Sequence, residues 1–290
     1  MSDEPSAGLD SDIACARALK EQLRAWNGVY DSATSAIWQK GVYEPVHGGW
    51  RFTNIGGRTV LSFISDIARL RPDSWALEIG SGLGDTSRYV AQRFGCTVVG
   101  VDMNESQVGH ARALARATSM EDRLQFVHAN IEDQHTVRTL RTLLPETGVD
   151  LVFTMDVLML TANPGAVVRS SAQFLRPGGW LALAEVTSGP VMTEPLRTHL
   201  WETDGMQSLL TPTEYAALIR EAGFSELRIV DRTPLAIDCF QKMAAAFTRE
   251  RFEIIEAAGS AQYDDWRNVT DLYVKCFRDG QLLYTQMLAR

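Results

Sequence analysis

Cysteine is scarce in this sequence, and long apolar runs and basic patches are missing from it. The chain has four cysteines in 290 residues, with no C-x-x-C pair and no metal-ligand spacing, which predicts reduced thiols, no metal site and a cytoplasmic location. No apolar run is long enough to cross a membrane, and residues 1–12 are acidic and polar, unlike a signal peptide. A formal charge of -8 without a basic patch argues against a nucleic-acid partner.

The remaining composition is that of a globular protein. Hydrophobic residues make up 45% of the chain and charged residues 22%, and 290 residues are enough for one large domain with an ample core. Residues 1–10 are rich in polar residues, Pro and Gly and predict a disordered tail. Apolar positions at helical spacing from Ile13 onward predict helices before residue 70, interrupted by an aromatic loop with a glycine pair at 41–50.

Three glycines at alternating positions, Gly80, Gly82 and Gly84, follow an apolar strand at Trp75–Ile79 and precede a helix that can start at Asp85. A strand that breaks into glycines and then a helix lets the backbone approach a ligand with no Cβ in the way. A dinucleotide-binding turn would need its third glycine where Asp85 stands, and a carboxylate there would repel a pyrophosphate. The alternative is a tight turn with no ligand.

Several motifs together resemble those of class I S-adenosylmethionine (SAM)-dependent methyltransferases of the small-molecule type, including sarcosine/dimethylglycine and natural-product methyltransferases. The pattern E-x-G-x-G-x-G that starts at Glu78 is similar to their motif I. Leu-Arg-Pro-Gly-Gly at 175–179 is similar to motif III, and it predicts a turn followed by a strand at Trp180–Val186. Between them, an apolar run from Cys96 ends in the acid Asp102. SAM carries an ammonium and a sulfonium and no phosphate, so an acid at Glu78 suits this ligand.

This resemblance implies an α/β fold with a Rossmann-like, seven-stranded, mostly parallel sheet, whose last strand is antiparallel, and with helices on both faces. A helical N-terminal lid would occupy residues 11–70, and the SAM-binding core residues 71–290. Two segments, 187–210 and 233–279, are predicted as cap insertions, and the first of them as the far wall of the acceptor site.

The resemblance also assigns cofactor contacts. Asp102 is expected to accept both ribose hydroxyls, with a helix cap as the alternative role, and Met103 to lie on the adenine ring, with a core position as the alternative. Asn130 stands where the family usually has an aspartate that accepts the adenine amino group. The predicted cofactor-binding residues are Glu78, Gly80, Ser81, Gly82, Gly84, Asp102, Met103, Asn130, Ile131 and Met155.

A general base is needed only when the acceptor holds a proton at neutral pH, and His47 in the aromatic loop is the first candidate. The alternative is a loop histidine bound by the backbone. Glu185 ends a strand and is predicted either to contact the acceptor or to serve as ion-paired scaffold, and Tyr30 completes the predicted catalytic set. Relatives often carry a histidine at the position of Leu158–Leu160, which weakens the case for a base from that loop.

The predicted substrate-binding residues are Trp50, Asp156, His199 and Trp201, with Asp156 contacting either the SAM ammonium or the acceptor. A helix N-terminal charge is the alternative role of Asp156. The tryptophans, with Tyr30, would enclose the acceptor or hold a cationic ammonium through cation–π contacts.

The resemblance therefore implies a methyltransferase that moves the sulfonium methyl of SAM to a nitrogen, oxygen or activated carbon of a small metabolite in secondary metabolism, leaving S-adenosylhomocysteine. Two alternatives stay open. One is an isoprenoid or natural-product C-methyltransferase or cyclase in which aromatics and Glu185 stabilise a carbocation. The other is a noncatalytic SAM-binding module. The sequence leaves the oligomeric state open, a homodimer included, and expects a small-molecule acceptor as the partner.

Overall fold

The computed structural model describes residues 44–47 and 52–290, so the predicted tail and most of the predicted lid, with Tyr30 and Trp50, lie outside the described residues. Seven strands form one sheet in the order β3-β2-β1-β4-β5-β7-β6. Their bounds are β1 Trp75–Ile79, β2 Thr97–Asp102, β3 Leu124–His128, β4 Val149–Met155, β5 Leu175–Ser188, β6 Leu227–Asp231 and β7 Leu282–Ala289.

The pairing of the strands confirms the predicted sheet. Strands β1 to β5 are parallel to one another, and β7 lies antiparallel between β5 and β6. Strand β4 is almost wholly buried along its length, as expected of a parallel strand covered on both faces. One boundary differs from the sequence expectation, which placed the start of the fifth strand at Trp180. Strand β5 begins at Leu175, because Leu175 already pairs with Val149 before a shift in register.

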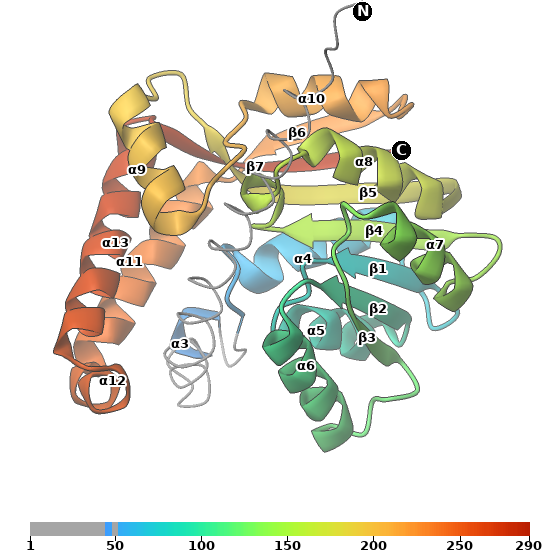
Figure 1. The fold of residues 1–290 in the computed structure, drawn as a ribbon, viewed down its shortest axis with the longest axis horizontal. Helices are drawn as coiled ribbons and strands as arrows, with labels where there is room; N and C mark the ends of the chain where they lie inside the picture. The colour runs from blue at the N-terminus through green and yellow to red at the C-terminus, as the bar shows by residue number, and fades with distance from the viewer. Residues whose placement is uncertain (1–43, 48–51) are drawn as a thin grey trace, which may run out of the picture.

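Helices cover both faces of the sheet, as Figure 1 shows. Helices α4, α5 and α6 contribute buried side chains to one core cluster, and α7, α8 and α10 to the cluster on the opposite face. The bounds are α3 Glu44–His47, α4 Gly57–Ala68, α5 Asp85–Phe94, α6 Glu105–Ala117, α7 Gln134–Leu143, η2 Leu158–Leu160, α8 Pro164–Phe174, α9 Glu194–Asp204, α10 Pro212–Glu221, α11 Thr233–Arg249, α12 Arg251–Ala258 and α13 Ser260–Arg278. None of these helices is long and apolar enough to span a membrane.

The later helices form a wall at the carboxyl ends of the parallel strands. In Figure 1, α9, α11 and α13 stand side by side beyond the tips of β4 and β1. The segment predicted as an insertion at 187–210 contains α9, and the one at 233–279 contains α11, α12 and α13. Phe240 of α11 stacks on Tyr273 of α13, with 4.8 Å between ring centroids, and both belong to the core cluster of α4 and α5. This packing joins the wall to the sheet.

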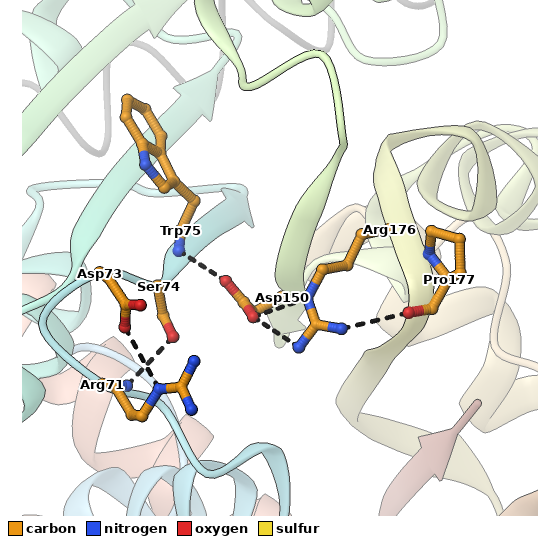
Figure 2. Close-up of polar contacts among 7 residues, drawn as sticks. All are labelled: Arg71, Asp73, Ser74, Trp75, Asp150, Arg176 and Pro177. Carbon is orange, nitrogen blue, oxygen red and sulfur yellow. Dashed lines mark hydrogen bonds and ion pairs between the residues drawn. The ribbon is translucent and has the colours of Figure 1, made fainter.

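The amino-terminal ends of β1, β4 and β5 lie on the other side of the sheet from this wall and are connected by polar contacts (Figure 2). The carboxylate of Asp150 accepts the backbone N–H of Trp75 at 2.9 Å and the Nε–H of Arg176 at 2.7 Å. Ser74 Oγ accepts the backbone N–H of Arg71 at 3.1 Å in the turn that leads into β1. These bonds fix where the parallel strands start relative to one another.

Candidate functional site

The glycine turn after β1 is held in a backbone conformation that favours glycine. Gly80, Gly82 and Gly84 have φ angles of 74°, 51° and 84°. A Cβ at Gly80 would lie 2.2 Å from Cγ2 of Val157, so the space around this residue is closed to any side chain. Helix α5 begins directly after the turn, at Asp85. The turn therefore presents bare backbone at the carboxyl end of β1, as the sequence predicts.

Two acids flank this turn. Glu78 is buried, its carboxylate accepts a hydrogen bond from Ser87 Oγ, and its burial raises its pKa to about 8. Asp102, at the end of β2, accepts the backbone N–H of Gly82 at 2.8 Å and that of Asn104 at 2.8 Å. Burial raises the pKa of Asp102, and these backbone bonds oppose the rise. Asp102 therefore fastens the glycine turn to the neighbouring strand.

The cap that the sequence offered as the alternative role of Asp102 is made by another residue. Asn104 Oδ1 accepts the N–H of Gln107 at 3.1 Å and caps α6. A carboxylate has about four lone-pair positions, and two of those on Asp102 are used by backbone N–H groups. The other two remain available for the pair of ribose hydroxyls that the resemblance implies.

Two observations mark this end of the sheet as a place where a ligand such as SAM would bind. The ends of three adjacent strands, β1, β2 and β4, carry residues that are partly exposed to solvent although the strands themselves are buried. These residues are Gly80, Gly82, Asp102, Met103 and Asp156. In addition, Ser81 Oγ, Asp156 Oδ1 and Asn54 Oδ1 are buried polar atoms with no hydrogen-bond partner among the described residues. Buried polar groups normally have partners, so these three atoms mark where ligand groups would bind.

The predicted adenine contacts lie at the ends of β2 and β3. Met103 is 39% exposed, which removes the alternative that it is a core residue, and Ile131 is buried. The side chain of Asn130 accepts the N–H of Glu132 at 3.0 Å. Its amide oxygen is thus already bonded within its own turn, and its contact with adenine stays a prediction.

The exit of β4 carries an aspartate in an unusual conformation. Asp156 has a φ of 59°, in the left-handed region that residues with a Cβ rarely adopt. Its Oδ2 accepts the backbone N–H of Ile55 at 2.7 Å, and burial raises its pKa to about 7. Met155 beside it is buried. Strain of this kind concentrates at functional sites, and here it brings a carboxylate to the point where β4 meets the chain before α4.

Glu185 is fully buried in β5, and its carboxylate is engaged by the protein. Its Oε2 accepts the N–H groups of Val157 and Leu158, each at 3.0 Å. Burial raises the pKa of Glu185 well above its ordinary value, the charge of Asp156 raises it further, and the N–H bonds oppose this rise. In the described residues Glu185 holds the exit of β4 in place. A direct contact with the acceptor remains a prediction.

His47 forms the end of α3 and is buried against the chain that enters α4. Its ring lies edge-on to Phe52, with 5.6 Å between centroids, and a Cβ at Gly57 would lie 2.6 Å from its Nδ1. Burial, with the charges of Lys242 and Arg58, lowers the pKa of His47 to about 4. Its Nε2 has no partner among the described residues. Neutral imidazole with one unpartnered nitrogen can accept a proton, although weakly.

Two contacts near the site were not singled out from the sequence. Tyr284 of β7 donates its hydroxyl to the carbonyl of Ile55 at 2.9 Å, so Ile55 is held from both sides, by Tyr284 and Asp156. Asn54 donates to Thr86 Oγ1 at 2.8 Å. Ile55 and Tyr284 are far apart in the sequence, and only the fold brings them together. The one sequence feature that could have indicated a polar contact here is a tyrosine within an apolar terminal strand.

The two predicted substrate residues on α9 lie away from this cluster. His199 and Trp201 are both exposed, and Trp201 is 52% exposed. Their neighbour Leu200 faces the core. A role of His199 and Trp201 in acceptor binding remains a prediction, as it does for Trp50 and Tyr30 outside the described residues.

The fold and the site together define a class of protein. An open sheet with β7 antiparallel between β5 and β6, a glycine turn after β1 and an acid at the end of β2 are the features of class I SAM-dependent methyltransferases. Ligands of such open sheets bind at the carboxyl ends of the strands, where the turn and the acids lie.

Comparison with known proteins agrees with this class. Residues 77–183 match the family model described as a methyltransferase domain. The chain is 24% identical over 78% of its length to sarcosine/dimethylglycine N-methyltransferase of Halorhodospira halochloris, and covers 78% of that protein. It is 22% identical over 82% of its length to phosphoethanolamine N-methyltransferase 1 of Arabidopsis thaliana, of which it spans 46%.

A solved structure shows the same fold. Phosphoethanolamine N-methyltransferase 2 of Haemonchus contortus, in complex with SAM, superposes with a TM-score of 0.75 at 15% identity, covering 90% of this chain and 57% of that chain. Residues 77–183 therefore form a methyltransferase domain, the chain is similar to SAM-dependent methyltransferases of small molecules, and its predicted fold class is confirmed.

Proposed function

We propose that this protein transfers the methyl group of SAM to a small metabolite that carries an amine. The observation that carries the proposal is Asp156, whose Oδ1 has no partner among the described residues although it is shielded from solvent. A cationic or amine-bearing group would supply that partner, and it would also favour the ionised form of a carboxyl whose pKa burial raises to about 7. Two relatives, both N-methyltransferases, support an amine acceptor.

When bound, SAM supplies a methyl carbon activated by the sulfonium, so the protein mainly has to align the acceptor and exclude water. Orientation of this kind can lower a barrier by roughly 7–11 kcal/mol. In this proposal Asp156 binds the acceptor nitrogen, and Glu185 keeps Asp156 in place by fixing the backbone of the next two residues. His47 takes the proton that an ammonium acceptor must lose.

The contacts of Glu185 argue against the alternative in which it stabilises a carbocation. Its Oε2 already accepts two backbone N–H groups, and Thr154 Oγ1 lies 3.4 Å from its Oε1.

We further propose, from the sequence resemblance alone, that the acceptor belongs to secondary metabolism. We also propose a cytoplasmic location. Three cysteines, Cys96, Cys239 and Cys276, are buried free thiols, and free thiols are typical of proteins in a reducing compartment.

The amine proposal is tested by methyl transfer from labelled SAM to matched acceptors. Sarcosine and phosphoethanolamine represent amines, and compounds with a hydroxyl in place of the nitrogen serve as their controls. We expect turnover with at least one amine. Asp156→Asn should raise the acceptor KM about 10–150-fold, the equivalent of about 1.5–3 kcal/mol for a lost charged hydrogen bond. Transfer to the hydroxyl compounds alone would overturn the amine acceptor. A loss of SAM affinity in Asp156→Asn would assign this carboxylate to the SAM ammonium instead.

A further inference from the structure

A groove of about 560 Å³ lies at the amino-terminal ends of β1, β4 and β5. The glycine turn is at the opposite, carboxyl end of these strands. Part of its wall is the set of contacts drawn in Figure 2, around Arg71, Asp150 and Arg176. The groove is rich in arginine, in contrast to the whole chain, which carries a net charge of -8. Five arginines line it: Arg69, Arg71, Arg176, Arg228 and Arg290.

The acids at the groove do not neutralise all of these arginines. Asp66 and Asp150 are the acids that line it. Arg176 pairs with Asp150 at 2.7 Å, and two acids outside the lining pair with Arg71 and Arg290. Arg69 and Arg228 have no hydrogen-bond or ion-pair partner within residues 44–47 and 52–290, and both are exposed. These two guanidinium groups are thus free to bind an external anion.

Trp180 fixes two of the guanidinium groups. Its ring is 8% exposed, and Cζ of Arg290 and of Arg228 lie 5.0 Å and 5.9 Å from its centroid. The two arginines reach it from adjacent antiparallel strands, since Glu226 and Arg290 exchange backbone bonds next to β6 and β7. A guanidinium held near an aromatic ring by a cation–π contact still has N–H groups that can donate, and this contact reduces the entropy lost on binding.

We propose that this groove binds a phosphate-bearing anion, with Arg69 and Arg228 as the first donors and Arg290 beside them. A planar guanidinium donates two parallel hydrogen bonds to a phosphate, and several of them around one groove suit an oligophosphate better than a single carboxylate. The ion pairs of Arg71 and Arg290 are exposed and therefore weak, so a phosphate can replace the carboxylate in them. The site is separate from the methyl-transfer site and does not rest on it.

Calorimetric titration of the full chain with pyrophosphate tests the proposal, at constant ionic strength and with sodium chloride as the salt control. We expect saturable binding that weakens at least about tenfold in Arg228→Ala and in Arg69→Ala. Arg249→Ala is the matched control and should bind as the wild type does, because it removes an exposed arginine at the end of α11 that pairs with Glu250. An inorganic phosphate arm and a nucleoside diphosphate arm distinguish a free phosphate from a phosphate ester as the ligand.

Two results would overturn the proposal. One is the lack of saturable binding at pyrophosphate concentrations up to ~10 mM. Such a result would mean that the binding free energy is smaller than about 3 kcal/mol. The other is equal weakening in Arg249→Ala, which would show only the general charge of the surface. Thermal unfolding of each variant is measured alongside. Arg69→Ala keeps the test decisive if Arg228→Ala fails to fold, because Arg69 is exposed and does not stack on Trp180.

Discussion

Replacing His47 by alanine should lower kcat by about 10²–10⁴, while the affinity for SAM stays close to the wild-type value, because the imidazole is proposed to act on the acceptor and not on the cofactor. The structure moves the expected loss toward the lower end of that range. Burial lowers the pKa of His47 to about 4, so the imidazole is neutral at physiological pH but a weaker base than an exposed histidine. Steady-state kinetics with an accepted amine measures the change.

The same pKa fixes the pH dependence. An exposed histidine would lose its function as a base through the ordinary histidine range of pH, whereas a pKa near 4 places the loss of the base below pH 5. Stability has a matching signature. The unfolded chain binds the proton more readily than the folded one, so this group lowers stability as the pH falls from about 6.5 toward 4. His47→Gln, which cannot titrate, should lose this pH dependence. Wild-type turnover in His47→Ala would reject the base.

Replacing Gly80 by alanine should destabilise the protein by about 2–5 kcal/mol and abolish tight SAM binding. The left-handed conformation costs an alanine about 1–2 kcal/mol, and forcing a methyl group into a packed site adds about 1–3 kcal/mol. The clash is with Cγ2 of Val157, which lies 2.2 Å from the point that the methyl carbon would occupy. The backbone N–H of Gly80 also bonds to Val101 at 2.8 Å, so a shift of this residue would disturb β2. Urea unfolding and SAM titration measure the two effects.

Gly178 offers a matched control for this prediction. Its φ of 75° is almost the same as the 74° of Gly80, but a Cβ there would meet nothing within 4 Å. Gly178→Ala should therefore cost only the conformational term, about 1–2 kcal/mol, and leave SAM binding intact. Equal losses in the two variants would show that the contact with Val157 is unimportant.

Much of the fold could be predicted from local sequence. The apolar runs of β1 and β4 have the period and length of buried parallel strands, and the glycines at 80, 82 and 84 mark a turn that side chains would block. The start of β5 was placed too late, because its first residues, Leu175 to Gly179, have the composition of a turn. Their pairing with β4 depends on a shift in register that no local pattern reveals.

The candidate site was predicted less completely, for a physical reason. Residues that bind through a motif, such as Asp102, are visible because the motif fixes their place on the strand. The contacts of Ile55 are not, because they join residues separated by 101 and 229 positions. Burial also cannot be inferred from the composition of a loop. No local pattern indicated that His47 would lie in surroundings that lower its pKa, or that the carboxylate of Glu185 would be bonded to backbone.

Calorimetry with SAM, S-adenosylhomocysteine and NAD tests the central claim most directly. Asp102 should bind the ribose of SAM and of its product, and Asp85, which stands where a dinucleotide-binding turn needs its third glycine, should disfavour a pyrophosphate. In Asp102→Ala the affinity for SAM should fall by about 1.5–3 kcal/mol, and the ligand-free protein should also lose stability, because two backbone N–H groups lose their acceptor. We predict saturable binding of SAM and S-adenosylhomocysteine and none of NAD. Tight binding of NAD with no response to SAM would contradict the assignment of this turn to SAM.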